Sequence, residues 1–330
     1  MLKRRRRRTL SYAKYGYIFS LPFVLAFLVF SLYPTLYTAV IGFTDMKGLT
    51  TTTFNFLEDP LANFRTILNN ASFRLSLGNT VKIWVINFIP QILLALLLTA
   101  WFTSNHNRIK GQGFFKVVFY MPNIITAATI AILFNVLFGY PMGPVNDTLV
   151  KAGILGQPYY FLSDKLASQL IISFIQFWMW YGYTMIVLIS GVLGINPEIY
   201  EAADIDGASD VQTFFYITVP NLRTILLFVL ITSMIGGLNM FDIPRLFNLG
   251  NPGNATLTTS LFIYNQAFSG SYFFNRAAAA SMIMFAIIAA FSVLTFFLMR
   301  DRREALARRE QKRLERAARR GEGGTRGAAR

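Results

Sequence analysis

The chain has 330 residues and is 54% hydrophobic, with a mean hydropathy of +0.45, yet it carries a formal net charge of +15. Only 14% of its residues are charged, whereas soluble domains average about a quarter. Apolar runs of about 20 residues, enough to cross about 30 Å of hydrocarbon, recur along it. We therefore expect an all-α polytopic membrane protein. The chain has no cysteine, and its single histidine, His106, lies in a polar stretch, so thiolate chemistry is excluded and no metal site is expected.

Six transmembrane spans are predicted in chain order, at about 17–41, 77–101, 114–138, 167–194, 216–238 and 277–299. The first span follows basic residues, as a signal peptide does, but its apolar stretch is too long and no small-residue cleavage site follows, which favours a retained helix. Pro22 and Pro34 are expected to kink or terminate it. A basic N-terminus, 1–16, precedes the six-span domain, 17–299, and a basic tail, 300–330, follows it.

The distribution of positive charge predicts the orientation of these spans. All but eight of the 31 lysines and arginines lie in the N-terminal segment, in the tail, or in and beside the loops 102–113 and 195–215. The positive-inside rule places those parts, and hence both termini, in the cytoplasm of a cell whose plasma membrane holds the chain. Anionic lipid is the expected partner of the arginine-rich tail, and nucleic-acid binding is disfavoured because the adjoining membrane already accounts for the charge.

The stretch from residue 195, "INPEIYEAADIDGASDVQTFFYITVP", is polar and acidic between two apolar runs. Asn196 is a good N-cap, Pro197 suits the first helical position, and Gly207 suits a tight change of direction. Two short helices are therefore expected to meet at the glycine, the second running into the fifth span. The residues alone leave two interpretations, a helix pair that docks in a groove of a basic partner or a solvated loop whose acids balance nearby arginines. The five carboxylates are Glu198, Glu201, Asp204, Asp206 and Asp210.

Part of this stretch, "EAADIDGASDVQTFFYITVP", resembles the EAA signature of ABC importer permeases. In that signature Glu-Ala-Ala is followed by three residues, Gly, nine residues and Ile-x-Leu-Pro, and Val219 here replaces the Leu. We call residues 196–220 the EAA segment. The resemblance assigns coupling to an ATPase to Glu201, Ala202, Ala203, Asp206, Gly207, Ile217 and Pro220, with Glu201 as the polar anchor and Gly207 as the bend.

The resemblance covers most of the chain, leaving out the N-terminal arginines and the tail. It is to permeases of the maltose, multiple-sugar and glycerol-3-phosphate importers, through "FSLYPTLYTAVIGFTD", "LGNTVKIW", "GQGFFKVVFYMPNII", "FDIPRLFNLGNPGNAT" and "IYNQAF". It implies a type I ABC importer core that translocates a sugar or oligosaccharide. The implied partners are a second homologous permease subunit, two ATPase subunits and an extracytoplasmic solute-binding protein.

The sequence contains no G-x-x-x-x-G-K-[ST] phosphate loop, so this chain is not expected to be an enzyme or to hold a cofactor. The ATP and magnesium of an importer are expected on the separate ATPase subunits. Polar groups inside the spans are also few, and such groups normally face a bundle interior or a watery cavity.

The fourth span carries the best candidates for substrate contact. Gln176, Trp180 and Tyr183 are spaced i, i+4, i+7 and share one helical face. Sugars are typically held by side-chain hydrogen bonds together with aromatic rings against their C–H faces. The alternative interpretation is hydrogen bonding between helices by Gln176, with both aromatic residues in packing positions.

The fifth span, through "TSMIGGLNMFD", adds two polar candidates, Ser233 and Asn239, beside glycines that allow close helix approach or local unwinding. The resemblance carries the sugar contacts of the maltose-type permeases onto Gln176, Tyr183 and Ser233. It does not reach Gly237, where a relative has a polar side chain. This leaves open whether the main substrate site lies in this subunit or in its partner.

Three other functions remain open. A permease for glycerol-3-phosphate or another phosphate ester or polyol would need basic residues along its pathway, and Lys82 and Arg223 lie near the ends of their spans. An ion-coupled carrier normally keeps an ionisable residue at mid-membrane, and carboxylates inside the spans are scarce. A scaffold that does not transport would use the EAA segment only for recruitment.

Overall fold

A computed structural model describes residues 13–49, 53–104, 109–270 and 272–299. The described chain is helical, apart from one isolated antiparallel bridge between Thr44 and Phe56, in agreement with the predicted fold class. The predictions for residues 1–12, His106 and the tail 300–330 fall outside the described residues.

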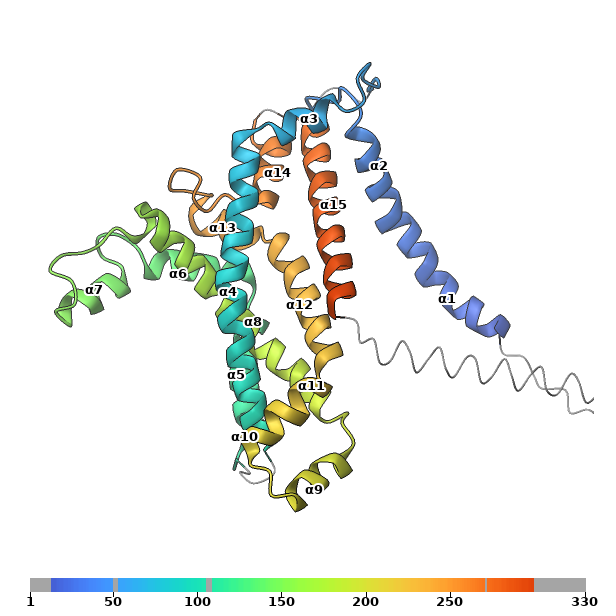
Figure 1. The fold of residues 1–330 in the computed structure, drawn as a ribbon. Coiled ribbons are helices and arrows are strands. Elements are labelled where there is room, and N and C mark those ends of the chain that lie inside the picture. The colour runs from blue at the N-terminus through green and yellow to red at the C-terminus, as the bar shows by residue number, and fades with distance from the viewer. Residues whose placement is uncertain (1–12, 50–52, 105–108, 271, 300–330) are drawn as a thin grey trace, which may run out of the picture. The chain divides into compact units, whose positions relative to one another are not determined.

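Four described helical stretches are long and apolar enough to cross a membrane, and they correspond to the predicted spans one, two, four and six. The first, Tyr15–Ile41, combines α1 (Ala13–Phe27), a π-helical turn over Leu28–Leu32 and α2 (Tyr33–Ile41). The others are α4 (Ala71–Thr103), α8 (Lys165–Val192) and α15 (Phe274–Met299). Helices α4 and α15 are seen over their whole length in Figure 1.

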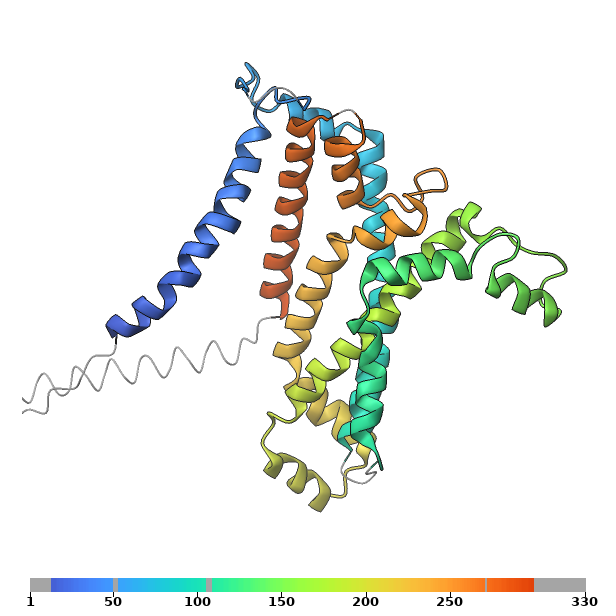
Figure 2. The same ribbon diagram turned by 180° about the vertical axis from the view of Figure 1, so that it is seen from behind.

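The two remaining predicted spans, 114–138 and 216–238, are each broken by a sharp bend. Helices α5 (Gln112–Ile124) and α6 (Ala127–Leu137) meet at 87°, a turn visible in Figure 2, and the helical stretch Asp210–Asn221 meets α12 (Arg223–Leu238) at 68°. The expectation that the second EAA helix runs on into the fifth span is therefore wrong, and the third predicted span consists of two helices. The described residues contain four candidate spans, or up to six if each bent pair counts as one.

The break between α5 and α6 has a local cause. Ile125 leaves the helical conformation, with φ −74° and ψ 138°, and Thr126 Oγ1 then accepts a hydrogen bond from the Thr129 backbone N–H at 3.3 Å. A threonine that satisfies one of the free N–H groups at a helix start is an N-cap. Apolar composition predicted a span here, but it carries no information on whether the helix is continuous.

The bend before α12 follows Pro220. The chain passes through α10 (Asp210–Thr213), a π-helical turn over Phe214–Thr218 and α11 (Val219–Asn221). A proline has no N–H to bond the preceding turn, and a widened turn ahead of it accommodates the loss. Leu222, with ψ 0°, then leaves the regular helix. The second helix of the EAA segment thus ends at Asn221, and it does not continue into α12 as one helix.

The first span also contains a π-helical turn shortly before a proline. The π-helical turn Leu28–Leu32 stands directly before α2, which has Pro34 in its first two residues, and the helical stretch continues to Ile41, so Pro34 does not terminate the span. Pro22 lies inside α1 and does not terminate it. Only 6% of the apolar window of this span is buried within the described chain.

The described chain divides into two compact units. The first comprises Met1–Lys82, Ala131–Gln169 and Asn239–Ala286, and the second comprises Ile83–Ile130, Leu170–Leu238 and Ile287–Arg330. Helices α4, α8 and α15 contribute residues to both. The shorter elements of the first unit are α3 (Ala62–Leu68), α7 (Pro144–Lys151), a 3₁₀ turn over Phe161–Ser163, α13 (Asp242–Asn248) and α14 (Thr259–Phe268). The second unit holds α9 (Pro197–Ile205) together with α10, α11 and α12.

Each unit has its own apolar core. In the first unit the core joins α3, α4, α14 and α15 through Ile67, Phe73, Leu257, Leu261, Phe262, Ala279 and Ala280. In the second it joins α4, α8 and α12 through Ala95, Leu98, Phe102, Tyr181, Met185, Leu188, Ile189, Val192, Leu222 and Val229. Helix α8 also approaches α5 closely, because a Cβ at Gly182 would lie 2.1 Å from the Phe119 carbonyl oxygen.

Candidate functional site

The EAA segment begins as the sequence predicts. The Asn196 side chain accepts a hydrogen bond from the Glu198 backbone N–H at 3.2 Å, and Pro197 is the first residue of α9. Glu198 in the first turn carries negative charge at the positive end of the helix dipole. The predicted N-cap and proline start are therefore confirmed.

Gly207 turns the chain after α9 with φ +75°, a left-handed conformation that glycine adopts at little cost. Nothing lies within 4 Å of the position that a Cβ would occupy there. The turn is closed by a hydrogen bond from the Ala208 N–H to the Ala203 carbonyl at 2.9 Å. The glycine is thus required by the backbone conformation and not by lack of space.

The second helix starts with a capping box that the sequence analysis missed. The Ser209 hydroxyl accepts from the Gln212 backbone N–H, and the Gln212 side chain accepts from the Ser209 N–H at 2.9 Å. The spacing Ser-x-x-Gln is a recognised start signal for a helix and would have placed the start of α10 at Asp210.

Two further hydrogen bonds hold the EAA segment, one within the segment and one to the end of α4, and both lie in the second unit. The Tyr200 hydroxyl lies 3.1 Å from the Thr218 hydroxyl, which joins α9 to the π-helical turn across the glycine. The Ser104 hydroxyl, at the end of α4, donates to the Asp210 carboxylate at 2.8 Å. Both pairs lie far apart in sequence, so no local pattern could reveal them.

The residues assigned to coupling are mostly at the surface. Glu201, Ala202, Asp206, Gly207 and Pro220 are exposed, Ile217 is half-buried and Ala203 is buried. A hollow of about 300 Å³ opens beside the glycine turn, lined by Asp206, Gly207, Ala208, Gln212, Thr213, Tyr216 and Ile217. The segment therefore presents small residues, acids and a recess on one short stretch of chain.

Among the described residues, the carboxylates of α9 and its turn have no ion-pair partner. Glu198, Glu201, Asp204 and Asp206 are exposed, and none of them forms an ion pair with a lysine or arginine of the described residues. The interpretation as a self-balanced solvated loop depends on such pairs. Exposed and unneutralised acids favour the docking interpretation.

Helix α8 carries Gln176, Trp180 and Tyr183, here called the α8 trio, on one side, as the spacing predicts. The rings of Trp180 and Tyr183 meet edge to face with centroids 5.8 Å apart. Trp180 is exposed, while Gln176 and Tyr183 are half-buried. Within the described part of the chain none of the three has a hydrogen-bond partner, so their polar groups are available to a ligand.

The fifth-span candidates differ from one another. Ser233 on α12 accepts a hydrogen bond from Trp84 Nε1 at 3.3 Å, whereas Asn239 follows α12 and is exposed. Trp84 on α4 was not among the predicted site residues. Its partner lies 149 positions away, and an aromatic residue in an apolar run gives no local signal of such a contact.

Little other chemistry gathers in the described residues. No group of three or more His, Cys, Asp or Glu is placed there to hold a metal ion. Lys82 on α4 donates to the Gln169 side-chain oxygen at 2.7 Å, so this amine already serves a protein partner. Arg223 lies exposed at the start of α12.

These features define a class of protein, a multi-pass helical membrane protein that presents an acidic, glycine-hinged helix pair. A family model described as the inner membrane component of binding-protein-dependent transport systems matches residues 66–305. The chain belongs to this family, and so it is a transport subunit.

Individual relatives span nearly the whole chain. It is 33% identical to the lactose transport system permease protein LacF of Rhizobium radiobacter, over 87% of this chain and 95% of the relative. It is 30% identical to the arabinooligosaccharides transport system permease protein AraP of Bacillus subtilis, over 88% and 91%. It is 28% identical to the trehalose/maltose transport system permease protein MalF of Thermococcus litoralis, over 88% and 96%.

A solved structure supports the fold. It is a crystal structure of a bacterial ABC transporter involved in the import of the acidic polysaccharide alginate. The similarity has a TM-score of 0.70 at 21% sequence identity and covers 87% of this chain and 95% of that chain.

Proposed function

We propose that the chain is the transmembrane permease subunit of an ATP-driven ABC importer that takes up a sugar or oligosaccharide. The observation that carries the proposal is the EAA segment, an exposed, acidic helix pair hinged at Gly207. The names of the relatives, which concern lactose, arabinooligosaccharides and trehalose/maltose, support the substrate class.

The partners follow from the same mechanism. An extracytoplasmic binding protein delivers the sugar, and a second, homologous permease subunit completes the pathway. A structural relative is a bacterial alginate ABC transporter in complex with a periplasmic protein that holds an alginate pentasaccharide, which supports a binding-protein partner. ATP and magnesium belong to two ATPase subunits, whose closure moves the EAA segment and, through it, the spans.

In this proposal the chain crosses the plasma membrane six times, with α5 and α6 together making the third crossing and α12 making the fifth. Both termini and the EAA segment face the cytoplasm, where the ATPase subunits dock, in keeping with the distribution of lysine and arginine. Glu201 is the polar anchor in the ATPase cleft, and Gly207 provides the turn that lets α9 enter it. Asp206, Ile217 and the hollow beside them offer the recess for an opposing side chain.

Substrate contacts fall to the α8 trio and Ser233 of the second unit, and Asn239, which belongs to the first unit, is a separate candidate. The unengaged amide and hydroxyl groups of α8, next to two aromatic rings, suit a neutral sugar. A phosphate ester is a weaker second candidate, because Lys82 is engaged by Gln169 and the described candidates include no arginine. An ion-coupled carrier and a scaffold that does not transport are outcomes that the experiment below distinguishes.

The decisive experiment compares two charge reversals in the tagged full-length subunit expressed in its native cell. Glu201→Lys places a positive charge on exposed α9. Asp147→Lys is the matched control, since Asp147 is exposed on another short helix, α7. Co-purification of ATPase subunits and uptake of radiolabelled lactose, maltose, trehalose and arabinotriose are measured for wild type and both variants.

We expect wild type and Asp147→Lys to retain the ATPase subunits and take up at least one sugar, and Glu201→Lys to lose both properties. Uptake without any bound ATPase or added ATP would favour the ion-coupled carrier instead. Bound ATPase whose hydrolysis no sugar-loaded binding protein stimulates would favour the scaffold. Equal loss in the two variants would remove Glu201 as the anchor.

A further inference from the structure

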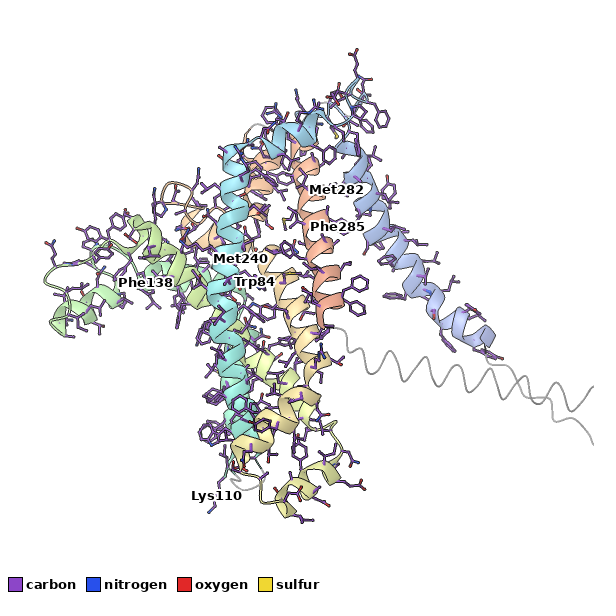
Figure 3. All side chains as sticks on the ribbon, viewed as in Figure 1. Trp84, Lys110, Phe138, Met240, Met282 and Phe285 are labelled. Carbon is purple, nitrogen blue, oxygen red and sulfur yellow. The ribbon has the colours of Figure 1, made fainter. Side chains whose placement is uncertain are left out.

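Gly237 on α12 leaves a space that an aromatic side chain of another helix fills. A Cβ at this position would lie 2.2 Å from Cδ1 and 2.8 Å from Cγ of Trp84, far inside van der Waals contact. Trp84 comes from α4 and lies between α4 and α12, as Figure 3 shows. The indole therefore occupies the position of the side chain that residue 237 lacks.

Two contacts fix the orientation of the Trp84 ring. Its Nε1–H donates to Ser233 Oγ at 3.3 Å, one helical turn before Gly237 on α12. Its ring stacks on Phe88, with centroids 5.5 Å apart and planes inclined by 20°. Trp84 is only half-buried, so part of the indole remains accessible beside these contacts.

The indole lies at the same depth as the α8 trio. Within the second unit, Ser173 on α8 donates to the Ile83 carbonyl of α4 at 3.4 Å, and Gln91 on α4 donates to Thr184 of α8 at 2.8 Å. The two bonds run in the same order along both helices, so the helices are parallel there. The part of α4 that carries Trp84 is thus level with the part of α8 that carries the trio.

The Ser233 hydroxyl group can still donate a hydrogen bond. Its oxygen accepts from Trp84, and within the described residues its hydroxyl proton has no acceptor. A serine held in this way offers an O–H to a sugar oxygen while the adjacent indole offers an aromatic face. Ser233 and Trp84 together therefore provide a hydrogen-bonding group and an aromatic face, the two kinds of group by which proteins typically hold sugars.

We propose that Trp84 is a specificity-determining residue of the transport pathway, that it presents its indole with the Ser233 hydroxyl to the passing sugar, and that Gly237 is what admits the indole. The inference rests on the proposed sugar-importer function.

The test uses the complete importer in proteoliposomes with its binding protein, and radiolabelled lactose, maltose, trehalose and arabinotriose as probes. Trp84→Ala is expected to raise the KM of the best of these sugars by about tenfold, the worth of one good aromatic contact, and to change the ratio of kcat/KM among sugars. Trp84→Phe, which keeps a ring but loses the N–H, is expected to fall between. Trp101→Ala, which removes an exposed tryptophan from the same helix, should leave the ratios unchanged.

Gly237→Ala tests whether the missing side chain at position 237 is what makes room for the Trp84 indole. It should push the indole out and reproduce the change in sugar ratios, whereas adding it to Trp84→Ala should cause no further change. If the Trp84→Ala importer fails to assemble, the inference is tested with the other two variants. Trp84→Phe keeps an aromatic ring at position 84, and Gly237→Ala keeps the indole itself.

Unchanged ratios in a transporting importer, or an equal loss for every sugar, would make Trp84 a packing residue and overturn this inference alone. A wild-type complex that imports none of the four sugars but does import glycerol-3-phosphate would overturn the sugar function, and this inference with it.

Discussion

The EAA segment and the connection between α13 and α14 are both polar, turn-rich stretches between apolar helices, but they use their polar groups in opposite ways. In the EAA segment the caps are local. Asn196 bonds a backbone group two residues on, and Ser209 and Gln212 bond each other three residues apart. The carboxylates of α9 point to the surface.

In the α13–α14 connection, residues 249–258, the backbone carbonyls are held by side chains from distant helices. Asn79 on α4 donates to the carbonyls of Asn254 at 2.8 Å and Leu257 at 3.2 Å. Gln169 on α8 donates to the Ala255 carbonyl at 2.6 Å and also contacts the Asn79 side-chain oxygen at 3.3 Å. Both donor residues are buried.

The difference indicates which segment can move. A stretch displaced as a piece keeps the hydrogen bonds that close within it, as the caps and the Tyr200–Thr218 bond of the EAA segment do, and loses only those that leave it, such as the bond from Ser104 to Asp210. A stretch bonded to other helices leaves buried carbonyls unpaired if it shifts, and each such group costs about 1 to 3 kcal/mol. The EAA segment therefore suits the transmission of a movement, and the α13–α14 connection suits a fixed part of the first unit.

The comparison predicts its largest effect at Asn79. Asn79→Ala removes the donor of two carbonyls and an acceptor of Gln169, so we expect about 2 to 4 kcal/mol less stability, within the range for several buried polar groups left unpaired. The readout is the unfolding midpoint of the purified subunit in detergent, which should fall clearly.

The matched control for Asn79 is Asn221→Ala. Asn221 also donates from its amide to a backbone carbonyl, that of Ile217 at 2.7 Å, but it is exposed at the end of the EAA segment. Its replacement should change the midpoint little. Equal shifts for the two variants would mean that the connection is no more firmly fixed than the EAA segment.

The sequence predicted the parts of the fold that local chemistry determines. The N-cap at Asn196 and the left-handed turn at Gly207 follow from the properties of those residues and their neighbours. The breaks at Thr126 and Leu222 were not predicted. Hydropathy measures the free-energy cost of placing residues in lipid, and this cost is the same whether two apolar helices are joined straight or by a bend. The Thr-x-x-Thr spacing after Ile125 is a cap signal that could have indicated the first break.

The candidate site was predictable to a similar extent. The common face of Gln176, Trp180 and Tyr183 follows from helical spacing alone. The pairing of Trp84 with Gly237, and that of Asp210 with Ser104, depends on which helices pack together, and one sequence contains no direct record of that.

A moderate effect is expected at Gly207. Gly207→Ala meets no steric obstacle, so its cost is the left-handed conformation alone, about 1 to 2 kcal/mol. We expect the affinity of the permease pair for its ATPase to fall by about tenfold, because 1.4 kcal/mol corresponds to that factor. Gly207→Asn should lose less affinity, because asparagine tolerates the left-handed conformation better than alanine.

Gly156→Ala is the control, since Gly156 is equally unobstructed and has no positive φ. Equal losses for alanine and asparagine would show that the conformation of the turn is not what matters.

The smallest effect is expected at Tyr200. Tyr200→Phe removes the hydrogen bond to Thr218 across the glycine turn, but Thr218 keeps the Thr213 carbonyl as a partner at 3.4 Å. The net loss should be about 0.5 to 1.5 kcal/mol, the usual value of one neutral hydrogen bond. Amide hydrogen exchange in α9 should accelerate by up to about tenfold, since the bond joins α9 to the rest of the second unit. Tyr216→Phe, at an exposed position of the same segment, should leave that exchange unchanged. If both variants accelerate it equally, α9 is held by its caps alone and moves independently of the helix that follows Gly207.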